Sequence, residues 1–180
     1  QEGTTPEEVN RHQAVKYDNS RKEGEVCLLL AAGNTSHLPG IDVFTQVFVE
    51  RKVVLCKCNP INEYMGPIYE KGLAPMIDAG VLKIAYGGEK TGQWLTGRPE
   101  VDALHLTGSR TTYESIVFGS DGMTAHRKAQ DSPVNDKPFT AELGNVSPVI
   151  LVPGAWSLDQ LHDQAAQLAS WTTLLAGYGC

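Results

Sequence analysis

The hydrophobic pattern from position 25 onward consists of short apolar runs separated by longer polar or helical stretches. Five runs have the length of strands, and most are rich in Val, Leu or Ile, as strands covered on both faces of a sheet require. They are Val26–Ala31, Val53–Lys57, Leu82–Tyr86, Ala103–Leu106 and Phe139–Glu142. A sixth run, Ser147–Val152, follows closely and is also expected to be a strand.

Residues typical of helix ends lie between these runs. Asp42 is expected to cap a helix that continues to about Glu50, and Asn62 to cap a second helix. Gly80 marks the end of the second helix, and Pro75 is expected to kink it.

The second half of the chain contains two further helical signals. Ser109 is expected to cap a helix over residues 110–118, whereas the polar residues 120–137 are expected to form a long surface loop. The clearest helix spans residues 157–176, because Ser157 and Gln160 have capping-box spacing and the apolar positions recur at helical intervals. The alternation of strands and helices predicts an α/β fold with a parallel sheet built from βαβ units.

The composition of the chain argues against nucleic acid and membranes as partners. The chain has 180 residues, 41% of them apolar, a net charge of −6 and a pI near 5.3. This acidic balance argues against nucleic acid or an anionic membrane surface as the partner. No apolar run approaches the roughly 18 residues that a membrane span needs. Residues 1–10 are polar and acidic and show no secretory signal.

The four cysteines are Cys27, Cys56, Cys58 and Cys180. The first three lie in strand-like runs, and a buried, reduced set is expected of a cytoplasmic protein. Cys56 and Cys58 have no second ligand pair to complete a zinc site, so we expect no metal.

Common catalytic motifs are absent: no G-x-G-x-x-G follows the first strand, and there is no phosphate loop or G-x-S-x-G elbow. Four short segments remain, in a fixed order. They are Ala-Gly-Asn at 32–34, Val-Leu-Cys-Lys-Cys-Asn-Pro at 54–60, Leu-Thr-Gly-Ser at 106–109, and Ala-Glu-Leu-Gly-Asn-Val-Ser-Pro at 141–148, this last followed by Gly-Tyr-Gly-Cys at 177–180. Together they resemble the aldehyde dehydrogenase superfamily over residues 25–180.

The resemblance implies an organisation of the chain. Residues 1–24 would be an N-terminal arm or the remnant of a preceding segment, and residues 25–144 a Rossmann-like NAD(P)-binding domain. Residues 145–180 would begin a catalytic domain whose remainder is missing. The full-length protein is expected to form a homo-oligomer, and the helix at 157–176 to lack part of its packing surface. The 180-residue chain alone is expected to be inactive.

The resemblance also implies catalytic roles. Cys180 matches the nucleophile that attacks the aldehyde carbon, and Asn34 matches the amide that stabilises the resulting oxyanion. Glu142 matches the general base that activates water to hydrolyse the thioester. Without the family pattern, the thiol would be an inert small hydrophobe, the amide a turn residue and the carboxylate a solvated strand-end group.

The cofactor implied is NAD or NADP. Lys57 matches a lysine that binds the adenine-side ribose, and Gly108 and Ser109 match the turn beneath the dinucleotide, at a helix N-terminus. Gly88 matches a glycine that allows the cofactor to approach closely. Outside the family context, the lysine would be a strand-end side chain and the glycines ordinary turns.

Two departures from the family leave alternatives open. Many members carry a ribose-binding glutamate three residues after the lysine, but Pro60 stands there and the nearest carboxylate is Glu63, so either NAD or NADP is possible. The residues around Asn34 also differ from those of many relatives, which indicates a divergent branch. The main prediction is oxidation of an aldehyde to a carboxylic acid. The alternatives are an acyl-CoA reductase or acylating dehydrogenase, and a non-catalytic dinucleotide-binding module.

Overall fold

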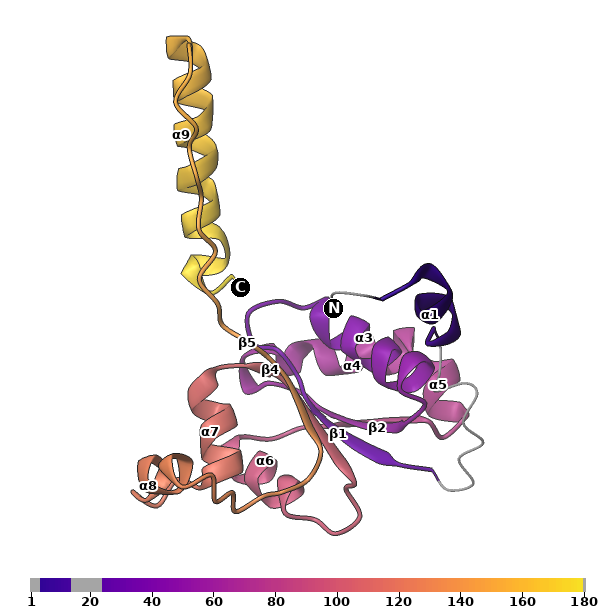
Figure 1. Ribbon diagram of the computed structural model, residues 1–180. Coiled ribbons are helices and arrows are strands. Elements are labelled where there is room, and N and C mark those ends of the chain that lie inside the picture. The colour runs from indigo at the N-terminus through magenta and orange to yellow at the C-terminus, as the bar shows by residue number, and fades with distance from the viewer. Residues whose placement is uncertain (1–3, 14–23, 180) are drawn as a thin grey trace.

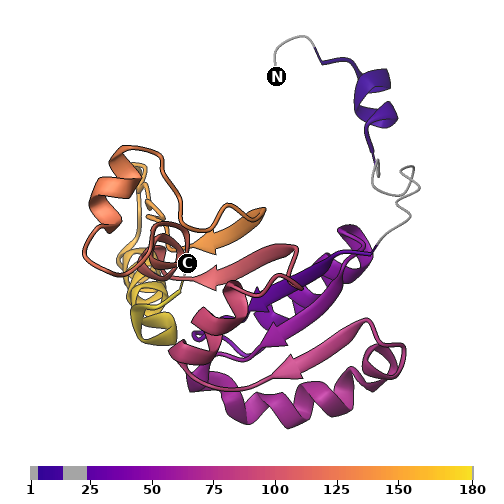
Figure 2. The same cartoon turned by 90° about the horizontal axis from the view of Figure 1, so that it is seen from below.

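The computed structural model describes residues 4–13 and 24–179. Five strands form one sheet in the order β3-β2-β1-β4-β5, and all neighbouring strands run parallel (Figures 1 and 2). The strands are β1 (Val26–Leu30), β2 (Val53–Lys57), β3 (Leu82–Ala85), β4 (Ala103–Gly108) and β5 (Phe139–Leu143). The prediction of an α/β fold with a parallel sheet is confirmed, and this strand order is that of doubly wound, Rossmann-like folds.

Helices cover both faces of the sheet (Figure 1). One face carries α3 (Leu38–Phe44), the π-helix η1 (Thr45–Val49), α4 (Gly66–Gly72) and α5 (Ala74–Asp78), with the 3-10 helix η2 (Pro60–Met65) preceding α4. The opposite face carries α6 (Glu89–Thr96) and α7 (Arg110–Phe118), and α8 (Thr124–Ala129) follows α7. The remaining helices are α1 (Pro6–Arg11), α9 (Leu158–Thr173) and the 3-10 helix η3 (Leu174–Gly177).

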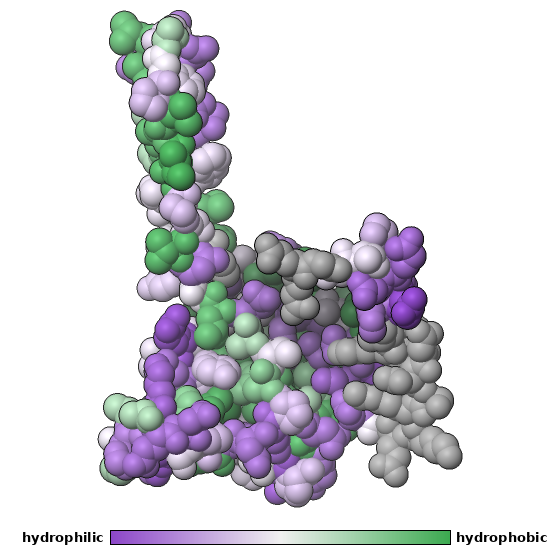
Figure 3. Space-filling view, in the orientation of Figure 1, coloured by the Kyte–Doolittle hydropathy of each residue, from purple (hydrophilic) through white to green (hydrophobic). Residues whose placement is uncertain are grey.

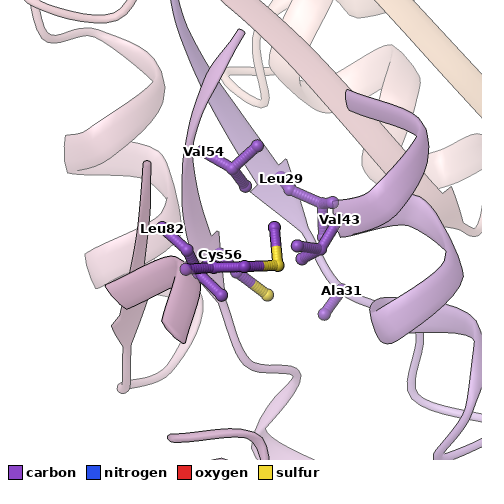
Figure 4. Close-up of a cluster of buried hydrophobic side chains, with 7 residues drawn as sticks. Leu29, Ala31, Val43, Val54, Cys56 and Leu82 are labelled. Carbon is purple, nitrogen blue, oxygen red and sulfur yellow. The ribbon is translucent and has the colours of Figure 1, made fainter. Parts of the chain in front are cut away.

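The core has two apolar layers, because successive residues of each strand point to opposite faces. Leu29, Val54 and Cys56 pack under α3 and α5 in one layer, which Figure 4 shows. Leu28 and Leu104 pack in the other layer, against side chains of α6 and α7. Each fully buried Leu or Val side chain stabilises the fold by about 1.5–3 kcal/mol, so these layers hold the strand ends in fixed positions.

Two predicted helix caps are wrong. Helix α3 begins at Leu38, so Asp42 lies inside it; Pro39 occupies the first turn, where its fixed φ favours helix initiation. The second predicted cap, Asn62, is buried within η2, and Asn59 caps that helix by accepting a hydrogen bond from the backbone of Ile61.

Other helical predictions are confirmed. Ser109 caps α7, and Ser157 caps α9 with a full capping box. The predicted second helix is divided at Leu73, two residues before Pro75, and Gly80 follows its end with a φ of +73°.

Two segments differ from the sequence prediction, and a third contains a helix that was not predicted. Residues 147–152 form no strand and are exposed; they follow β5 and pair with neither edge strand of the sheet, β3 or β5. The predicted loop at 120–137 contains α8. Within the predicted arm at 1–24, the described residues include α1, which Thr5 caps.

Helix α9 extends away from the body of the fold, and the chain that follows β5 runs alongside it (Figure 1). The helix has no buried residue, and Figure 3 shows hydrophobic side chains along the projection that α9 forms together with the chain after β5. The expectation that this helix lacks part of its packing surface stays a prediction, with which its exposure agrees. Among the described residues, no helix is both long enough and apolar enough to cross a bilayer.

Candidate active site

The carboxyl ends of all five strands bring the predicted site residues to one edge of the sheet. Asn34 follows β1, Lys57 ends β2, Gly88 follows β3, Gly108 ends β4 and Glu142 is the next-to-last residue of β5. The chain winds from β1 toward β3 on one side and places β4 on the other, so the order reverses between β1 and β4. Ligands of open α/β sheets bind in the crevice at such a reversal.

Asn34 contacts the C-terminal segment of the chain. Its half-buried side chain donates a hydrogen bond of 2.7 Å from Nδ2 to the carbonyl oxygen of Tyr178. Cys180, the predicted nucleophile, lies outside the described residues, two positions beyond this contact. The fold thus joins the loop after β1 to the segment that leads into the predicted nucleophile.

Asn62 is a polar residue of this region whose role the sequence analysis missed. It is 7% exposed, and its Nδ2 lies 3.1–3.2 Å from the carbonyl oxygens of Ala32, Gly33 and Thr35, to which it donates. These carbonyls belong to the loop that carries Asn34. The sequence signal for Asn62 resembles that of a helix cap, and nothing in the local pattern indicates a contact with residues about thirty positions earlier.

Two other side chains from the same segment support this loop. The hydroxyl of Tyr69 donates a 2.5 Å hydrogen bond to the carbonyl of Ser36. A Cβ atom at Gly33 would lie 2.8 Å from Nδ2 of Asn59, so only a glycine fits there without displacing that side chain.

Lys57 is 5% exposed at the end of β2, between the strands that lead to the loops at 32–36 and 86–88. Burial lowers the pKa of its ammonium group, and the nearby carboxylate of Glu63 opposes that shift. A buried cation close to the crevice is suited to binding a polar or anionic ligand.

Glu63 lies in η2, and the charge of its carboxylate acts on both Lys57 and Cys58 at the end of β2. Its Oε1 accepts a 2.5 Å hydrogen bond from the backbone nitrogen of Gly87. A carboxylate that is bound to the loop after β3 therefore acts on the buried lysine, although Pro60 occupies the position of the glutamate that the resemblance implies.

Of the two glycines in the loop after β3, Gly87 is required by the backbone conformation and Gly88 is not. Gly87 has a φ of +117°, and a Cβ there would lie 2.4 Å from Oγ1 of Thr91, so this position requires glycine. Gly88, which the sequence analysis singled out, precedes α6, and a Cβ there would meet open space. The backbone at Gly88 is thus open to an approaching ligand.

The turn after β4 presents the N-terminus of α7. Ser109 caps this helix by accepting a 3.0 Å hydrogen bond from the backbone nitrogen of Thr112. Gly108 is exposed at the end of the strand. The unpaired backbone N–H groups of a helix N-terminus favour an anionic ligand such as a phosphate.

Glu142 is exposed on β5, in register with Thr107 of β4. Two strands lie between it and β2, and one lies between it and β1. It shares the edge of the sheet with the other predicted residues, but no hydrogen bond among the described residues joins it to Asn34.

A partly buried polar cluster links α3 to β4 and β5. Oδ2 of Asp42 accepts a 2.8 Å hydrogen bond from Thr107, and its Oδ1 lies 3.7 Å from Nε2 of His105. Nδ1 of His105 lies 2.7 Å from the hydroxyl of Thr140. Asp42 therefore connects α3 to the strand beneath the crevice, a role that the sequence analysis did not anticipate.

The three described cysteines are buried and free. Burial raises the pKa of the Cys27 thiol to about 11 and that of Cys56 to about 12. It also raises the pKa of Cys58. Thiols with such pKa values are poor nucleophiles at neutral pH. Within residues 4–13 and 24–179, no group of three or more His, Cys, Asp or Glu side chains is arranged to hold a metal.

Comparison with known proteins identifies related sequences and folds. The family model described as "Aldehyde dehydrogenase family" matches residues 66–178. Betaine aldehyde dehydrogenase from Vibrio vulnificus is 33% identical over 94 residues, which are 52% of this chain and 16% of that protein. The chain thus matches less than a fifth of that relative's length.

Two solved structures share the fold. One, from Burkholderia cenocepacia and described as an aldehyde dehydrogenase, has a TM-score of 0.63 at 22% identity and covers 87% of this chain and 30% of its own. The other, a succinic semialdehyde dehydrogenase from Streptococcus pyogenes solved with NADP+, has a TM-score of 0.60 at 18% identity, covering 96% and 38% respectively.

Proposed function

Because this chain belongs to the aldehyde dehydrogenase family, we propose that the whole protein oxidises an aldehyde to a carboxylic acid with NAD or NADP as cofactor. The observation that carries the proposal is the hydrogen bond from Asn34 to Tyr178, because it brings a neutral amide donor next to the segment that ends in Cys180. In the proposed division of the chain, residues 25–144 bind the dinucleotide and residues 145–180 begin the catalytic domain.

The residues at the carboxyl edge of the sheet fit a dinucleotide. The N-terminus of α7 after Gly108 and Ser109 suits the phosphates, the open backbone at Gly88 permits close approach, and Lys57 and Glu63 suit a ribose. The bound dinucleotide supplies the hydride acceptor of the reaction. One of the solved relatives was determined with NADP+, which agrees with a cofactor of this kind.

In the proposed mechanism, the thiolate of Cys180 attacks the aldehyde carbon and forms a thiohemiacetal. A side-chain amide has two N–H groups, so Asn34 keeps one for the substrate oxyanion while the other binds Tyr178. After loss of hydride, the thioester is hydrolysed by a water molecule that Glu142 deprotonates. The exposed position of Glu142 on β5 gives it access to water.

The experiment that tests this function uses the whole protein and a panel of aldehydes with each nicotinamide cofactor. We expect aldehyde-dependent formation of the reduced cofactor, abolished in Cys180→Ser and retained in Cys58→Ser. Labelling with iodoacetamide at neutral pH should modify Cys180 selectively, since burial keeps the described thiols protonated. Activity that survives Cys180→Ser would contradict the proposal.

A further inference from the structure

We propose that Asn62 is a positioning residue for the reaction, which holds the loop at residues 32–35 so that the amide of Asn34 points toward the reacting oxygen. This inference rests on the proposed function of Asn34. Asn62 touches no reacting atom in this assignment, and it acts only through the backbone on either side of Asn34.

The geometry of the three hydrogen bonds supports this role. The carbonyl of Gly33 lies in the peptide plane that contains the backbone nitrogen of Asn34, so Asn62 fixes the orientation of that plane directly. The carbonyls of Ala32 and Thr35 bracket the same residue on its two sides. One amide nitrogen thus restrains the backbone before and after Asn34.

The cost of leaving these carbonyls unpaired explains why the restraint is strong. Asn62 is 7% exposed, and its contact with the carbonyl of Ala32 is fully buried, so water does not readily replace it. A buried backbone carbonyl without a hydrogen-bond partner lowers the stability of the folded state by about 1–3 kcal/mol. The loop therefore has one strongly preferred conformation while Asn62 is in place.

The contacts at the two ends of the loop leave Asn34 itself free to act. Tyr69 holds the carbonyl of Ser36, and the side chain of Asn59 lies against Gly33; among the described residues, neither side chain forms a hydrogen bond with the side chain of Asn34. The only hydrogen bond that the Asn34 side chain donates to another described residue goes to the carbonyl of Tyr178. The loop is thus restrained through its backbone, and the catalytic amide projects from it.

The inference is tested by a double-mutant cycle on Asn34 and Asn62 in the whole protein. Asn62→Ala is expected to lower kcat by about 10- to 100-fold, as small misplacements of catalytic groups do, without changing the affinity for the cofactor. In the Asn34→Ala background, the same substitution should lower kcat no further, because its effect passes through Asn34.

A matched control removes a similar hydrogen bond elsewhere. Asn135 donates from its side-chain amide to the carbonyl of Thr96, outside the loops at the carboxyl edge of the sheet. Asn135→Ala should lower the thermal midpoint without changing kcat. If Asn62→Ala does not fold, Asn62→Ser replaces it in the cycle. The serine hydroxyl and a water molecule can form hydrogen bonds with the carbonyls of the loop without holding these carbonyls in one orientation.

The outcomes separate the two proposals. If Asn34→Ala keeps full activity, the proposed role of Asn34 fails, and the role of Asn62 fails with it. If Asn34→Ala is impaired but the Asn62 substitution leaves kcat intact, or lowers it equally in both backgrounds, only the positioning role is overturned. A loss of kcat in Asn135→Ala equal to that in Asn62→Ala would also overturn it, because the effect would then be one of general stability.

Discussion

The side-chain amide of Asn34 donates a hydrogen bond to the carbonyl oxygen of Tyr178, at 2.7 Å and across 144 positions of the sequence. This contact is the point where the loop after β1 meets the end of the chain. It restrains the backbone two residues before Cys180, so a change at Asn34 affects both the proposed oxyanion site and the approach to the proposed nucleophile.

Asn34→Asp tests the amide as a hydrogen-bond donor without changing its size. Removal of one oxyanion donor typically lowers kcat by about 10²- to 10³-fold, and here a carboxylate would also face the carbonyl of Tyr178. Steady-state kinetics should show this loss in kcat, with cofactor binding unchanged by calorimetry. A variant that keeps wild-type kcat would remove Asn34 from the mechanism.

Lys57→Met is expected to stabilise the fold at pH 7 and to weaken cofactor binding. Burial lowers the pKa of Lys57 in the folded state, so the unfolded chain binds more protons between the folded and unfolded pKa values, and stability rises with pH through that window. Below the pKa that Lys57 has in the folded state, the protein bears the full cost of burying a charged ammonium group. Removal of this group should add about 0.5–2 kcal/mol to the free energy of unfolding.

The measurement for this variant is chemical denaturation at several pH values. The advantage of Lys57→Met over the wild type should shrink as the pH rises toward the ordinary lysine value of about 10.4. Lys71→Met, at an exposed position in α4, serves as the control and should show no such trend. An advantage that grows with pH would contradict the assigned sign.

Because burial raises the pKa of the cysteine thiols, we expect the protein to lose stability in alkaline solution. The pKa of Cys27 is raised by burial from 9.0 to about 11, so the folded state holds its proton longer than the unfolded chain does. The protonated thiol contributes about 2–3 kcal/mol to the free energy of unfolding below pH 9, and this contribution is lost as the pH rises through 11. Between these pH values, the free energy of unfolding measured by chemical denaturation should fall more steeply with pH for the wild type than for Cys27→Ala.

Asp42→Ser distinguishes the structural role of Asp42 from that of a helix cap. Serine caps helices as well as aspartate does, so a cap would tolerate the change. In the structure the carboxylate accepts from the buried hydroxyl of Thr107, and its loss should cost about 1–3 kcal/mol in the free energy of unfolding. Asp78→Ser, at an exposed position in α5, is the control and should stay within about 0.5 kcal/mol of the wild type.

Glu63→Gln tests the choice between NAD and NADP. The charge of the carboxylate acts on Lys57 and would repel a 2′-phosphate bound there, so we expect the wild type to prefer NAD. Removal of the charge should raise the ratio of kcat/KM for NADP to that for NAD by about tenfold, which corresponds to roughly 1.4 kcal/mol. Glu70→Gln should leave the ratio unchanged, and an equal shift in both variants would indicate a general charge effect.

Elements that depend on local patterns could be predicted from the sequence. The five strands follow from short apolar runs, and the caps at Ser109 and Ser157 follow from side chains that bond within their own first turn. The gathering of Asn34, Lys57 and Gly108 at one edge also follows, since carboxyl ends of parallel strands meet there.

Contacts between segments distant in the sequence could not be predicted in this way, because they depend on how the whole chain folds. Asp42 and Asn62 carry the sequence signature of helix caps, but their polar atoms bond to Thr107 and to the loop after β1, because burial makes unpaired acceptors there more costly than an uncapped helix end. The run at 147–152 shows the converse: its apolar pattern suits a strand, yet it runs beside α9, away from the sheet, and shares no ladder of hydrogen bonds with the edge strands β3 and β5.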